Sequence, residues 1–180
     1  EAHESYKAWS TPPATAAGDT HLGEIVKWLN HNVPTDTFIC NGAGNYSFWV
    51  HRFYQYSHYR SQLAPTNGAM GYGTPAAVAA KLMHPDREVI AFAGDGCFLM
   101  NGQEFATAVQ YGANIIVIVV NNAMYGTIRM HQEREYPGRV SGTTLSNPDF
   151  AALAVAYGGY GEQVKRTEDF PAAFERAKAS

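Results

Sequence analysis

Residues 88–96 of the chain read EVIAFAGDG, and residues 114–122 read NIIVIVVNN. Both stretches contain an apolar run of strand length that ends in small polar residues. The residues between them, 101–111, predict a helix. A strand, a helix and a second strand, with both strands apolar on both faces, are typical of a parallel sheet with helices on its two sides. The sequence therefore predicts an α/β fold of three layers, α/β/α, with a mostly parallel sheet.

The rest of the chain extends this alternation of strands and helices. By apolar spacing, further helices are expected at residues 22–29, 45–53, 72–83, 147–157 and 168–179. The first of these helices follows a cap at Asp19 or Thr20. Further strands are expected at residues 37–41, 62–64 and 160–164. Residues 1–18 are rich in Ala and Pro and predict the remnant of an interdomain linker. The length of 180 residues and the apolar content of 46% predict one domain, over residues 19–180.

Charge and hydropathy exclude two classes of partner. The net charge is −3 and the Lys and Arg residues are scattered, whereas binding to a nucleic-acid backbone needs a clustered basic face. The longest aliphatic run, 115–120, is far shorter than the roughly 20 apolar residues that span a bilayer. We therefore expect neither a nucleic-acid partner nor a membrane partner. Cys40 and Cys97 have no redox or metal-ligand spacing, which fits two buried thiols in a cytoplasmic protein.

Charged residues make up only 16% of the chain, while aromatic residues reach 13%. Soluble domains carry roughly 25% charged residues. The composition therefore predicts that other protein covers part of the surface, as in a homo-oligomer, and the aromatic segment 48–59 is the expected contact. A weakly charged monomer is the alternative that the composition leaves open.

Polar residues follow both apolar strands, Asp95 after the first strand and Asn122 after the second. Residues 97–120 are long enough for one helix and one returning strand, which places the two strand ends side by side. Ligands of such sheets bind at the carboxyl ends of the strands. Mg²⁺ takes oxygen ligands and is usually held by one or two protein groups together with phosphates and water. The Asp95 carboxylate and the Asn122 amide oxygen therefore predict a Mg²⁺ site.

An acidic chain would bind a diphosphate through backbone N–H groups, a helix N-terminus and such a cation. The motifs Gly94-Asp95-Gly96 and Asn121-Asn122, at this spacing, resemble the signature of enzymes that depend on thiamine diphosphate (ThDP). Residues 68–77, 98–104 and 147–150 resemble the acetolactate synthase and 2-oxo acid decarboxylase branch of that family. The resemblance covers nearly the whole chain from residue 22 onward. It implies a domain that binds the diphosphate end of ThDP together with Mg²⁺.

The resemblance also implies roles for individual residues. The metal ligands would be the side chains of Asp95 and Asn122 and the backbone carbonyl of Met124. Two residues would have a catalytic role: Met70 would hold ThDP in its bent form, and the Gly68 carbonyl would accept a hydrogen bond from the aminopyrimidine. A gap-filling core side chain is the alternative for Met70. The full set of residues implied at the cofactor is Gly68, Met70, Gly94, Asp95, Gly96, Cys97, Asn122, Met124, Tyr125 and Gly126, with Gly96 and Cys97 donating backbone N–H groups to the diphosphate.

Three residues beyond the metal loop are expected on the substrate side, namely Thr127, Ile128 and His131. A solvated helix position is the alternative for His131. Acetohydroxyacid synthases that make branched-chain precursors usually carry a Trp where this chain has His131, so the substrate stays open. Three smaller departures are Thr74, where Leu is usual in the family, Ala123, where Gly is common, and Cys97, where Ser is common. None of these departures removes a ligand.

A competing motif occurs in residues 71–76, which fit the dinucleotide-binding pattern G-x-G-x-x-A. No convincing strand leads directly into this motif, as that pattern requires, and Pro75 lies inside the turn. A nicotinamide-binding domain is therefore disfavoured.

The resemblance further implies that a carboxylate for N1′ of the aminopyrimidine comes from a separate pyrimidine-binding domain, usually on a neighbouring subunit. No segment of this chain fits that domain, and the family's final strand does not follow before Ser180. We therefore expect part of a longer polypeptide that is inactive alone. The expected reaction is decarboxylation and carboligation of 2-oxo acids, as in acetolactate synthases. A 2-oxo acid decarboxylase, similar to benzoylformate or pyruvate decarboxylase, and a non-catalytic ThDP-binding module are the alternatives.

Overall fold

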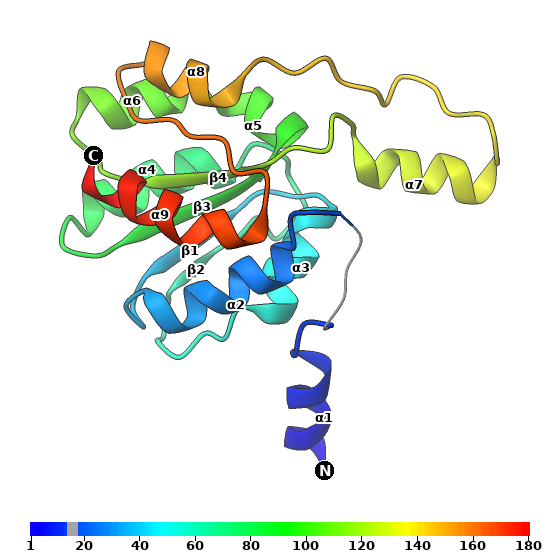
Figure 1. The fold of residues 1–180 in the computed structure, drawn as a ribbon, viewed down its shortest axis with the longest axis horizontal. Helices are drawn as coiled ribbons and strands as arrows, with labels where there is room; N and C mark the ends of the chain where they lie inside the picture. The colour runs from blue at the N-terminus through cyan, green and yellow to red at the C-terminus, as the bar shows by residue number, and fades with distance from the viewer. Residues whose placement is uncertain (14–17) are drawn as a thin grey trace.

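The computed structural model of the protein describes residues 1–13 and 18–180. Over these residues the sheet has the strand order β2-β1-β3-β4, and every pairing is parallel (Figure 1). The strands are β1 (Phe38–Asn41), β2 (Gln62–Leu63), β3 (Val89–Gly94) and β4 (Ile116–Val120). Ile90 of β3 pairs with Ile39 on one side and with Ile116 on the other. The predicted α/β class is confirmed.

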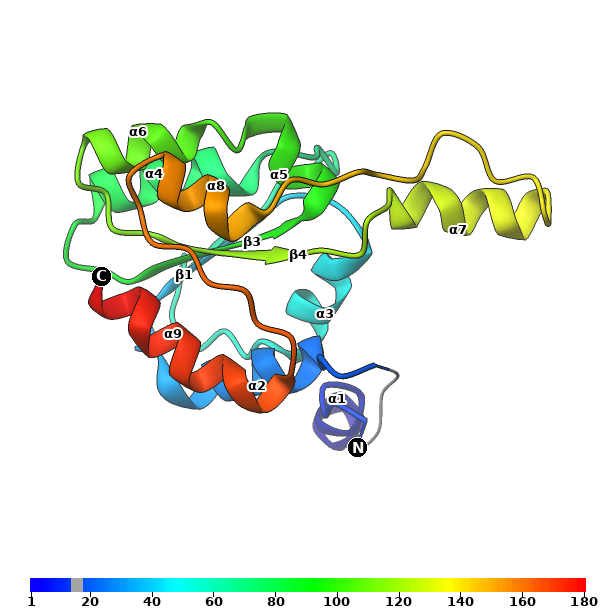
Figure 2. The ribbon, with the colours of Figure 1, turned by 45° about the horizontal axis from the view of Figure 1, so that its top comes forward.

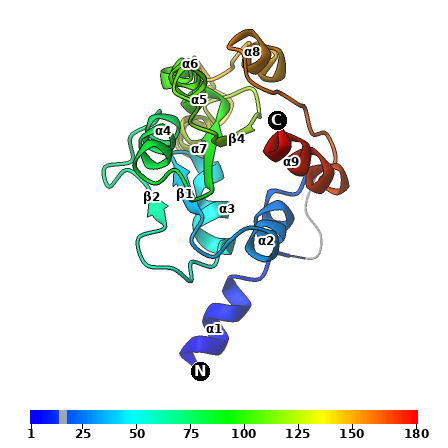
Figure 3. The same cartoon turned by 90° about the vertical axis from the view of Figure 1, so that its left-hand side faces the viewer.

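Helices cover both faces of the sheet (Figure 2). The helices on one face are α2 (Leu22–Asn32), α3 (Asn45–Phe53) and α9 (Phe170–Ala179). Those on the other face are α4 (Gly73–Met83), α5 (Asp95–Asn101), α6 (Glu104–Gln110) and α8 (Phe150–Ala156). Figure 3 shows α2 and α9 across the strands from α4. The molecule therefore has the three layers that the sequence predicts.

Two helices lie outside these layers. α7 (Gly126–Glu135) extends past the carboxyl ends of the strands and buries none of its residues. α1 (Ala2–Trp9) lies where the sequence predicts a linker, and it also buries none of its residues. The carbonyl of Trp9 accepts a hydrogen bond of 2.7 Å from Arg52 Nε on α3. Across the described parts of the chain, every helix falls short of the length and apolarity needed to cross a membrane.

The core is built on β3, whose side chains are apolar on both faces. Ile90 and Phe92 belong to a cluster with α2, α3 and α9, whereas Val89 and Ala91 belong to a cluster with α4. β4 was expected to be buried like β3, but all of its residues are only half-buried. The reason is that β4 is the last strand in the order of the described sheet, so its outer edge has no strand beside it.

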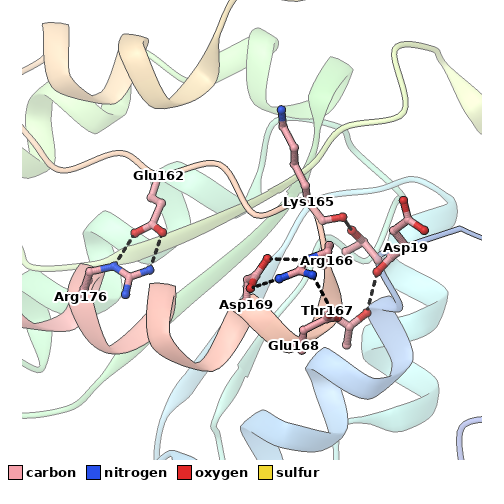
Figure 4. Close-up of polar contacts among 9 residues, drawn as sticks. Asp19, Glu162, Lys165, Arg166, Thr167, Glu168, Asp169 and Arg176 are labelled. Carbon is pink, nitrogen blue, oxygen red and sulfur yellow. Dashed lines mark hydrogen bonds and ion pairs between the residues drawn. The ribbon is translucent and has the colours of Figure 1, made fainter.

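The segment before α9 is tied to the start of α2 (Figure 4). Thr20 Oγ1 donates to the Lys165 carbonyl at 2.8 Å, and the Thr167 N–H donates to the Asp19 carbonyl at 3.0 Å. The predicted cap of this helix at Asp19 or Thr20 is wrong, because His21 is the N-cap residue and no side chain caps α2. The Thr20 hydroxyl holds the distant segment instead. A short 3-10 helix, η1 (Thr167–Asp169), leads into α9.

Two other predictions of local structure are wrong. The helix expected at 101–111 is α6, which begins only at Glu104, and a separate helix, α5, starts directly after β3. The strand expected at 160–164 pairs with no other strand among the described residues. Within that segment Glu162 forms an ion pair of 2.6 Å with Arg176 of α9, and Val164 packs against the core cluster. These contacts lead the chain from α8 to α9 across the sheet. Residues 160–164 therefore do not add a strand beside β4.

Candidate functional site

A cavity of about 290 Å³ opens at the carboxyl ends of β3 and β4. Parallel strands bring the loops that follow them to one edge of the sheet, so residues far apart in the sequence share this cavity. The predicted site residues that line it are Met70, Gly94, Asp95, Gly96, Cys97, Asn122, Met124, Tyr125, Gly126, Thr127 and Ile128.

Asp95 is the first residue of α5, and its side chain is buried, with 3% exposure. Its Oδ1 accepts the Gly96 N–H at 2.9 Å, and its Oδ2 accepts the Asn147 amide at 2.7 Å. Both donors are neutral, and Asp95 joins none of the ion pairs found among the described residues. A buried carboxylate is costly without a positive partner. The surroundings of Asp95 therefore suit a cation.

The loop after β4 presents Asn122 and Met124 to the cavity. Between them Ala123 has a left-handed backbone, with φ 55°, and its carbonyl accepts the Leu145 N–H at 2.9 Å. Met124 pairs with Thr144 in an isolated antiparallel bridge. Asn122 Oδ1 accepts the Met124 N–H at 3.2 Å. An amide oxygen has two acceptor positions, so Asn122 keeps one for a ligand while the loop is held in place.

The Cys97 thiol connects the first turn of α5 to the loop that carries Met70. Its sulfur accepts the Gly71 N–H at 3.0 Å and the Tyr46 hydroxyl at 3.4 Å. Burial, reinforced by the neighbouring Cys97, raises the pKa of Tyr46 above its usual value, so the phenol keeps its proton and donates it to this hydrogen bond. Asn101 of α5 also donates to the Gly71 carbonyl at 3.1 Å. Two side chains of α5 therefore form hydrogen bonds with the backbone N–H and the carbonyl of Gly71, the residue that follows Met70.

Two predicted residues do not line the cavity. Gly68 is exposed in a turn with φ 68°. His131 is exposed on α7, where its Nδ1 lies 2.9 Å from Arg134 Nη2. Only the first turn of α7, with Thr127 and Ile128, reaches the cavity. The position of His131 matches the solvated helix position that was its alternative, and a role for it toward substrate stays a prediction.

The prediction from sequence missed other residues at the site. Asn45 and Tyr46 follow β1 and line the cavity, and Asn45 Oδ1 accepts the Thr127 hydroxyl at 2.8 Å. The rule that polar residues after buried strands form the site, applied also to the strand at 37–41, would have identified Asn45, the first polar residue after that strand. Asn147 contacts Asp95, although its segment suggested only a family resemblance. Its contact depends on the fold and has no local signal.

Residues 42–180 match the family described as "Thiamine pyrophosphate enzyme, C-terminal TPP binding domain". The chain belongs to this family. Thiamine pyrophosphate is another name for ThDP, so membership of the family confirms the cofactor that the motifs predict. The matched range includes the loops after β1, β3 and β4, and therefore most of the cavity lining.

Relatives within the family include acetolactate synthases. The chain is 36% identical over 160 residues to the acetolactate synthase large subunit of Corynebacterium glutamicum, covering 86% of this chain and 26% of that protein. It is 40% identical over 132 residues to the acetolactate synthase of Arthrospira platensis, covering 72% and 23%. The chain thus spans about a quarter of the length of these curated relatives. The predicted resemblance to acetolactate synthases is confirmed.

The fold also matches a solved enzyme structure, the thiamine diphosphate-dependent 4-hydroxybenzoylformate decarboxylase of Rhodococcus jostii RHA1. The TM-score is 0.85 at 31% sequence identity, over 94% of this chain and 32% of that chain. Both kinds of enzyme in the predicted branch, synthase and decarboxylase, are therefore represented among the similar proteins.

Proposed function

We propose that this domain holds Mg²⁺ and the diphosphate of ThDP within a longer enzyme that decarboxylates a 2-oxo acid and joins the product to a second carbonyl compound, as acetolactate synthases do. The observation that carries the proposal is the meeting of Asp95 and Asn122 at one cavity, each just beyond the carboxyl end of its own parallel strand. The similarity to acetolactate synthases supports the carboligation step.

The oxygen atoms at the cavity suit Mg²⁺. Among residues 1–13 and 18–180, no three His, Cys, Asp or Glu side chains form a metal-binding group. The available ligands are the Asp95 carboxylate, the Asn122 amide oxygen and the Met124 carbonyl, which also accepts the Gly126 N–H at 2.9 Å. Mg²⁺ takes such a set in phosphate sites and fills its other positions with phosphate and water.

Backbone N–H groups at the start of α5 are proposed to bind the diphosphate. The Gly96 N–H already donates to Asp95 Oδ1 at 2.9 Å, so that bond has to open if Gly96 is to bind a phosphate oxygen. The Cys97 N–H lies in the first helical turn, where N–H groups have no partner within the helix. Gly94, Tyr125 and Gly126 complete the wall around this position.

Met70 is proposed to support the bent form of the cofactor. Its side chain is half-buried, packs against the main core cluster and lines the cavity. Packing against the core would therefore hold Met70 in place where it contacts a bound ring. The Gly68 carbonyl is proposed to accept from the aminopyrimidine. Bound ThDP supplies a nucleophilic carbon that adds to the substrate carbonyl. Thr127, Ile128 and His131 are proposed on the substrate side.

The carboxylate for N1′ of the aminopyrimidine is proposed to come from a pyrimidine-binding domain of the same polypeptide on a neighbouring subunit of a homo-oligomer. A carboxylate at that position favours the tautomer that accepts the proton during activation. Support comes from the length of the relatives, of which this chain spans about a quarter.

Removal of the metal tests the binding part of the proposal. In the full-length enzyme, calorimetry should detect tight ThDP binding with Mg²⁺ present and its loss after treatment with a chelator, because the diphosphate and the acidic Asp95 repel each other without a cation. Unchanged ThDP affinity in the chelator would contradict the proposed Mg²⁺ site.

Simple decarboxylation is the second candidate reaction, favoured by the similarity to 4-hydroxybenzoylformate decarboxylase. The two reactions are distinguished by analysing the products that the full-length enzyme forms from pyruvate and from aromatic 2-oxo acids. Acetolactate or acetoin supports carboligation. Release of the aldehyde alone, above all benzaldehyde from benzoylformate, would replace the proposed reaction by the second candidate.

A further inference from the structure

The segment Asn147-Pro148-Asp149-Phe150 contacts the proposed metal site without lining the cavity. Asn147 Nδ2 donates to Asp95 Oδ2 at 2.7 Å and to Asn121 Oδ1 at 2.8 Å. A primary amide nitrogen carries two hydrogens, so it can serve both acceptors at once. An ionised carboxylate only accepts hydrogen bonds, which fixes the orientation of the Asn147 amide. One side chain therefore joins the end of β3 to the end of β4.

The contact with Asn121 reaches the loop that carries the other metal ligands. Asn121 Oδ1 also accepts the Ala123 N–H at 3.1 Å, which forms the turn around Asn122. Asn147 therefore holds the Asp95 carboxylate directly and the position of Asn122 through this turn.

Asn147 is itself fixed relative to the helix that begins with Asp95. The Phe150 ring packs edge-on against the Phe98 ring of α5, with centroids 5.6 Å apart. Asp149 Oδ1 accepts the Ala152 N–H at 3.0 Å and caps α8, and this cap makes no hydrogen bond to Asn147 or Asp95. These contacts form a closed ring that includes the Asp95 carboxylate. The ring runs from Asp95 along α5 to Phe98, across to Phe150 and back to Asn147.

The amide oxygen of Asn147 contributes no hydrogen bond to this arrangement. It is buried and has no partner among the described residues. Buried polar atoms are rarely left unpaired in proteins, and each exception calls for an explanation. The hydrogen bonds of the Asn147 side chain therefore go only to Asp95 and Asn121 among the described residues.

We propose that Asn147 is a positioning residue for metal binding, which orients Asp95 and the turn at Asn121 before the cation binds. This inference rests on the proposed Mg²⁺ site. Mg²⁺ demands nearly ideal octahedral geometry at short distances, so a carboxylate that can rotate freely binds it less well. Hydrogen-bond partners that orient metal ligands are known to tune metal affinity in this way.

The test is a Mg²⁺ titration of ThDP binding to the full-length enzyme, followed by calorimetry. Asn147→Ala should raise the Mg²⁺ concentration for half-saturation by about tenfold or more, the loss typical of a missing partner of a metal ligand. The matched control is Asp149→Ala, which removes the cap of α8 two residues away and leaves the Asp95 contact intact. It should lower the melting temperature without changing the Mg²⁺ requirement.

A merely structural role for Asn147 predicts that both variants lose melting temperature and that neither changes the Mg²⁺ requirement, which would overturn the inference. Asp95→Ala separates the inference from the proposed function. If Asp95→Ala binds Mg²⁺ and ThDP as the unmodified enzyme does, the metal site itself is wrong. If Asp95→Ala loses binding while Asn147→Ala keeps it, only the role of Asn147 is wrong.

Asn147→Asp keeps the shape of the side chain and replaces the alanine variant in the Mg²⁺ titration if the alanine variant does not fold. It replaces the donor nitrogen by an oxygen that faces the Asp95 carboxylate, and like charges at this distance repel. Weaker Mg²⁺-dependent binding of ThDP supports the inference, whereas unchanged or tighter binding overturns it.

Discussion

The Asp95 carboxylate is buried at the first position of α5, and its hydrogen-bond donors, Gly96 and Asn147, are neutral. Removing a carboxylate from water is costly unless a positive charge compensates for it. The N-terminal end of a helix carries a partial positive charge, which offsets only part of that cost. A divalent cation would offset the rest, so the surroundings of this one residue favour the proposed metal site.

Asp95→Ala and Asn122→Ala are each expected to weaken Mg²⁺-dependent ThDP binding by more than about a hundredfold, beyond the roughly 10–100-fold loss caused by changing the partner of a ligand. Both residues lie at strand ends, outside the apolar clusters, so the fold should persist. Calorimetry measures the affinity, and the melting temperature of the metal-free protein is the control. Unchanged affinity in Asp95→Ala would mean that the metal ligands are misassigned.

Met70→Ala is expected to lower turnover in the full-length enzyme more than it lowers ThDP affinity, because Met70 would act on the shape of the cofactor and not on its diphosphate. Met70 is half-buried against the core, so a stability loss of about 2 kcal/mol is also expected, at the low end for Met→Ala changes. Met70→Leu, which keeps most of the volume, should restore both properties. An affinity loss as large as that of Asp95→Ala would exclude the role.

Ala123→Gly is expected to leave stability unchanged or to raise it by up to about 1 kcal/mol, because a left-handed backbone is unfavourable for Ala and not for Gly. The φ of Ala123 is 55°. The control is Ala172→Gly, at an exposed position inside α9, which should cost about 1 kcal/mol. Urea unfolding of both variants measures the difference. Equal losses in the two variants would show that the loop after β4 is not left-handed in solution.

Elements with a strong local pattern could be predicted from the sequence, and elements set by distant contacts could not. The helix predicted at 45–53 is α3, and the strand predicted at 37–41 is β1 with one residue fewer. The helix α5 was missed because the helix predicted after the first strand started only at residue 101, although Asp95 is the first helical residue. The strand expected at 160–164 is absent from the described sheet, because Glu162 contacts α9 and Val164 packs against the core cluster.

The candidate site divides in the same way. Asp95 and Asn122 could be predicted because each stands within two residues of the end of an apolar strand, and parallel strands bring such residues together. Asn147 could not be predicted in this way, because 52 positions separate it from Asp95 and only the packing of α8 on α5 brings them together. Gly68 was assigned by resemblance to the family and His131 by its place after the metal loop, and neither lines the cavity.

The ion pair between Glu162 and Arg176 predicts a pH dependence of the stability of α9. The hydrogen bond from Arg176, followed by that from Tyr160, lowers the pKa of Glu162 from 4.5 to about 2. A carboxyl group whose pKa is lowered by folding stabilises the protein fully above its unfolded pKa and loses this effect as the pH falls through its folded pKa. The contribution should therefore be complete above pH 4.5 and disappear toward about pH 2.

This expectation is checked by measuring the free energy of unfolding of the unmodified protein and of Glu162→Gln from pH 7 downward. The difference between them should be constant near neutral pH and should shrink between pH 4.5 and about pH 2. Arg176→Gln, which removes the partner, should abolish the same dependence. A difference that is flat across this pH interval would show that the ion pair does not form in solution.

The aromatic segment 48–59 exposes fewer of its apolar residues than the sequence suggests. Within the aromatic segment 48–59, Phe53 and Tyr54 are buried in the core, with 2% and 5% exposure. Phe48 and Tyr59 remain exposed, at 68% and 79%. Trp49 is 36% exposed and also lines the cavity. Exposed aromatic residues near a cavity often mark a contact with other protein. This surface is therefore the expected contact with the proposed second domain or subunit.

The 180-residue chain, produced alone, is expected to fold because its sheet and helices bury two apolar clusters within it. It is also expected to self-associate through Phe48 and Tyr59, which would lack their partner. Light scattering coupled to size-exclusion chromatography measures the association, and Phe48→Ser should reduce it. A chain that stays monomeric at high concentration would show that this surface does not need a partner.

The same isolated chain is expected neither to turn over pyruvate nor to bind ThDP tightly. Turnover requires a carboxylate at N1′ of the aminopyrimidine to favour the reactive tautomer, and that group is proposed to lie in another domain. Binding should be weak because Asp95, Asn122 and the start of α5 would contact only the diphosphate end of ThDP. The pyrimidine ring would then contact protein on one side only. Carbon dioxide release from pyruvate, with ThDP and Mg²⁺ supplied, is the measurement. Steady release by this chain alone would refute the requirement for a second domain.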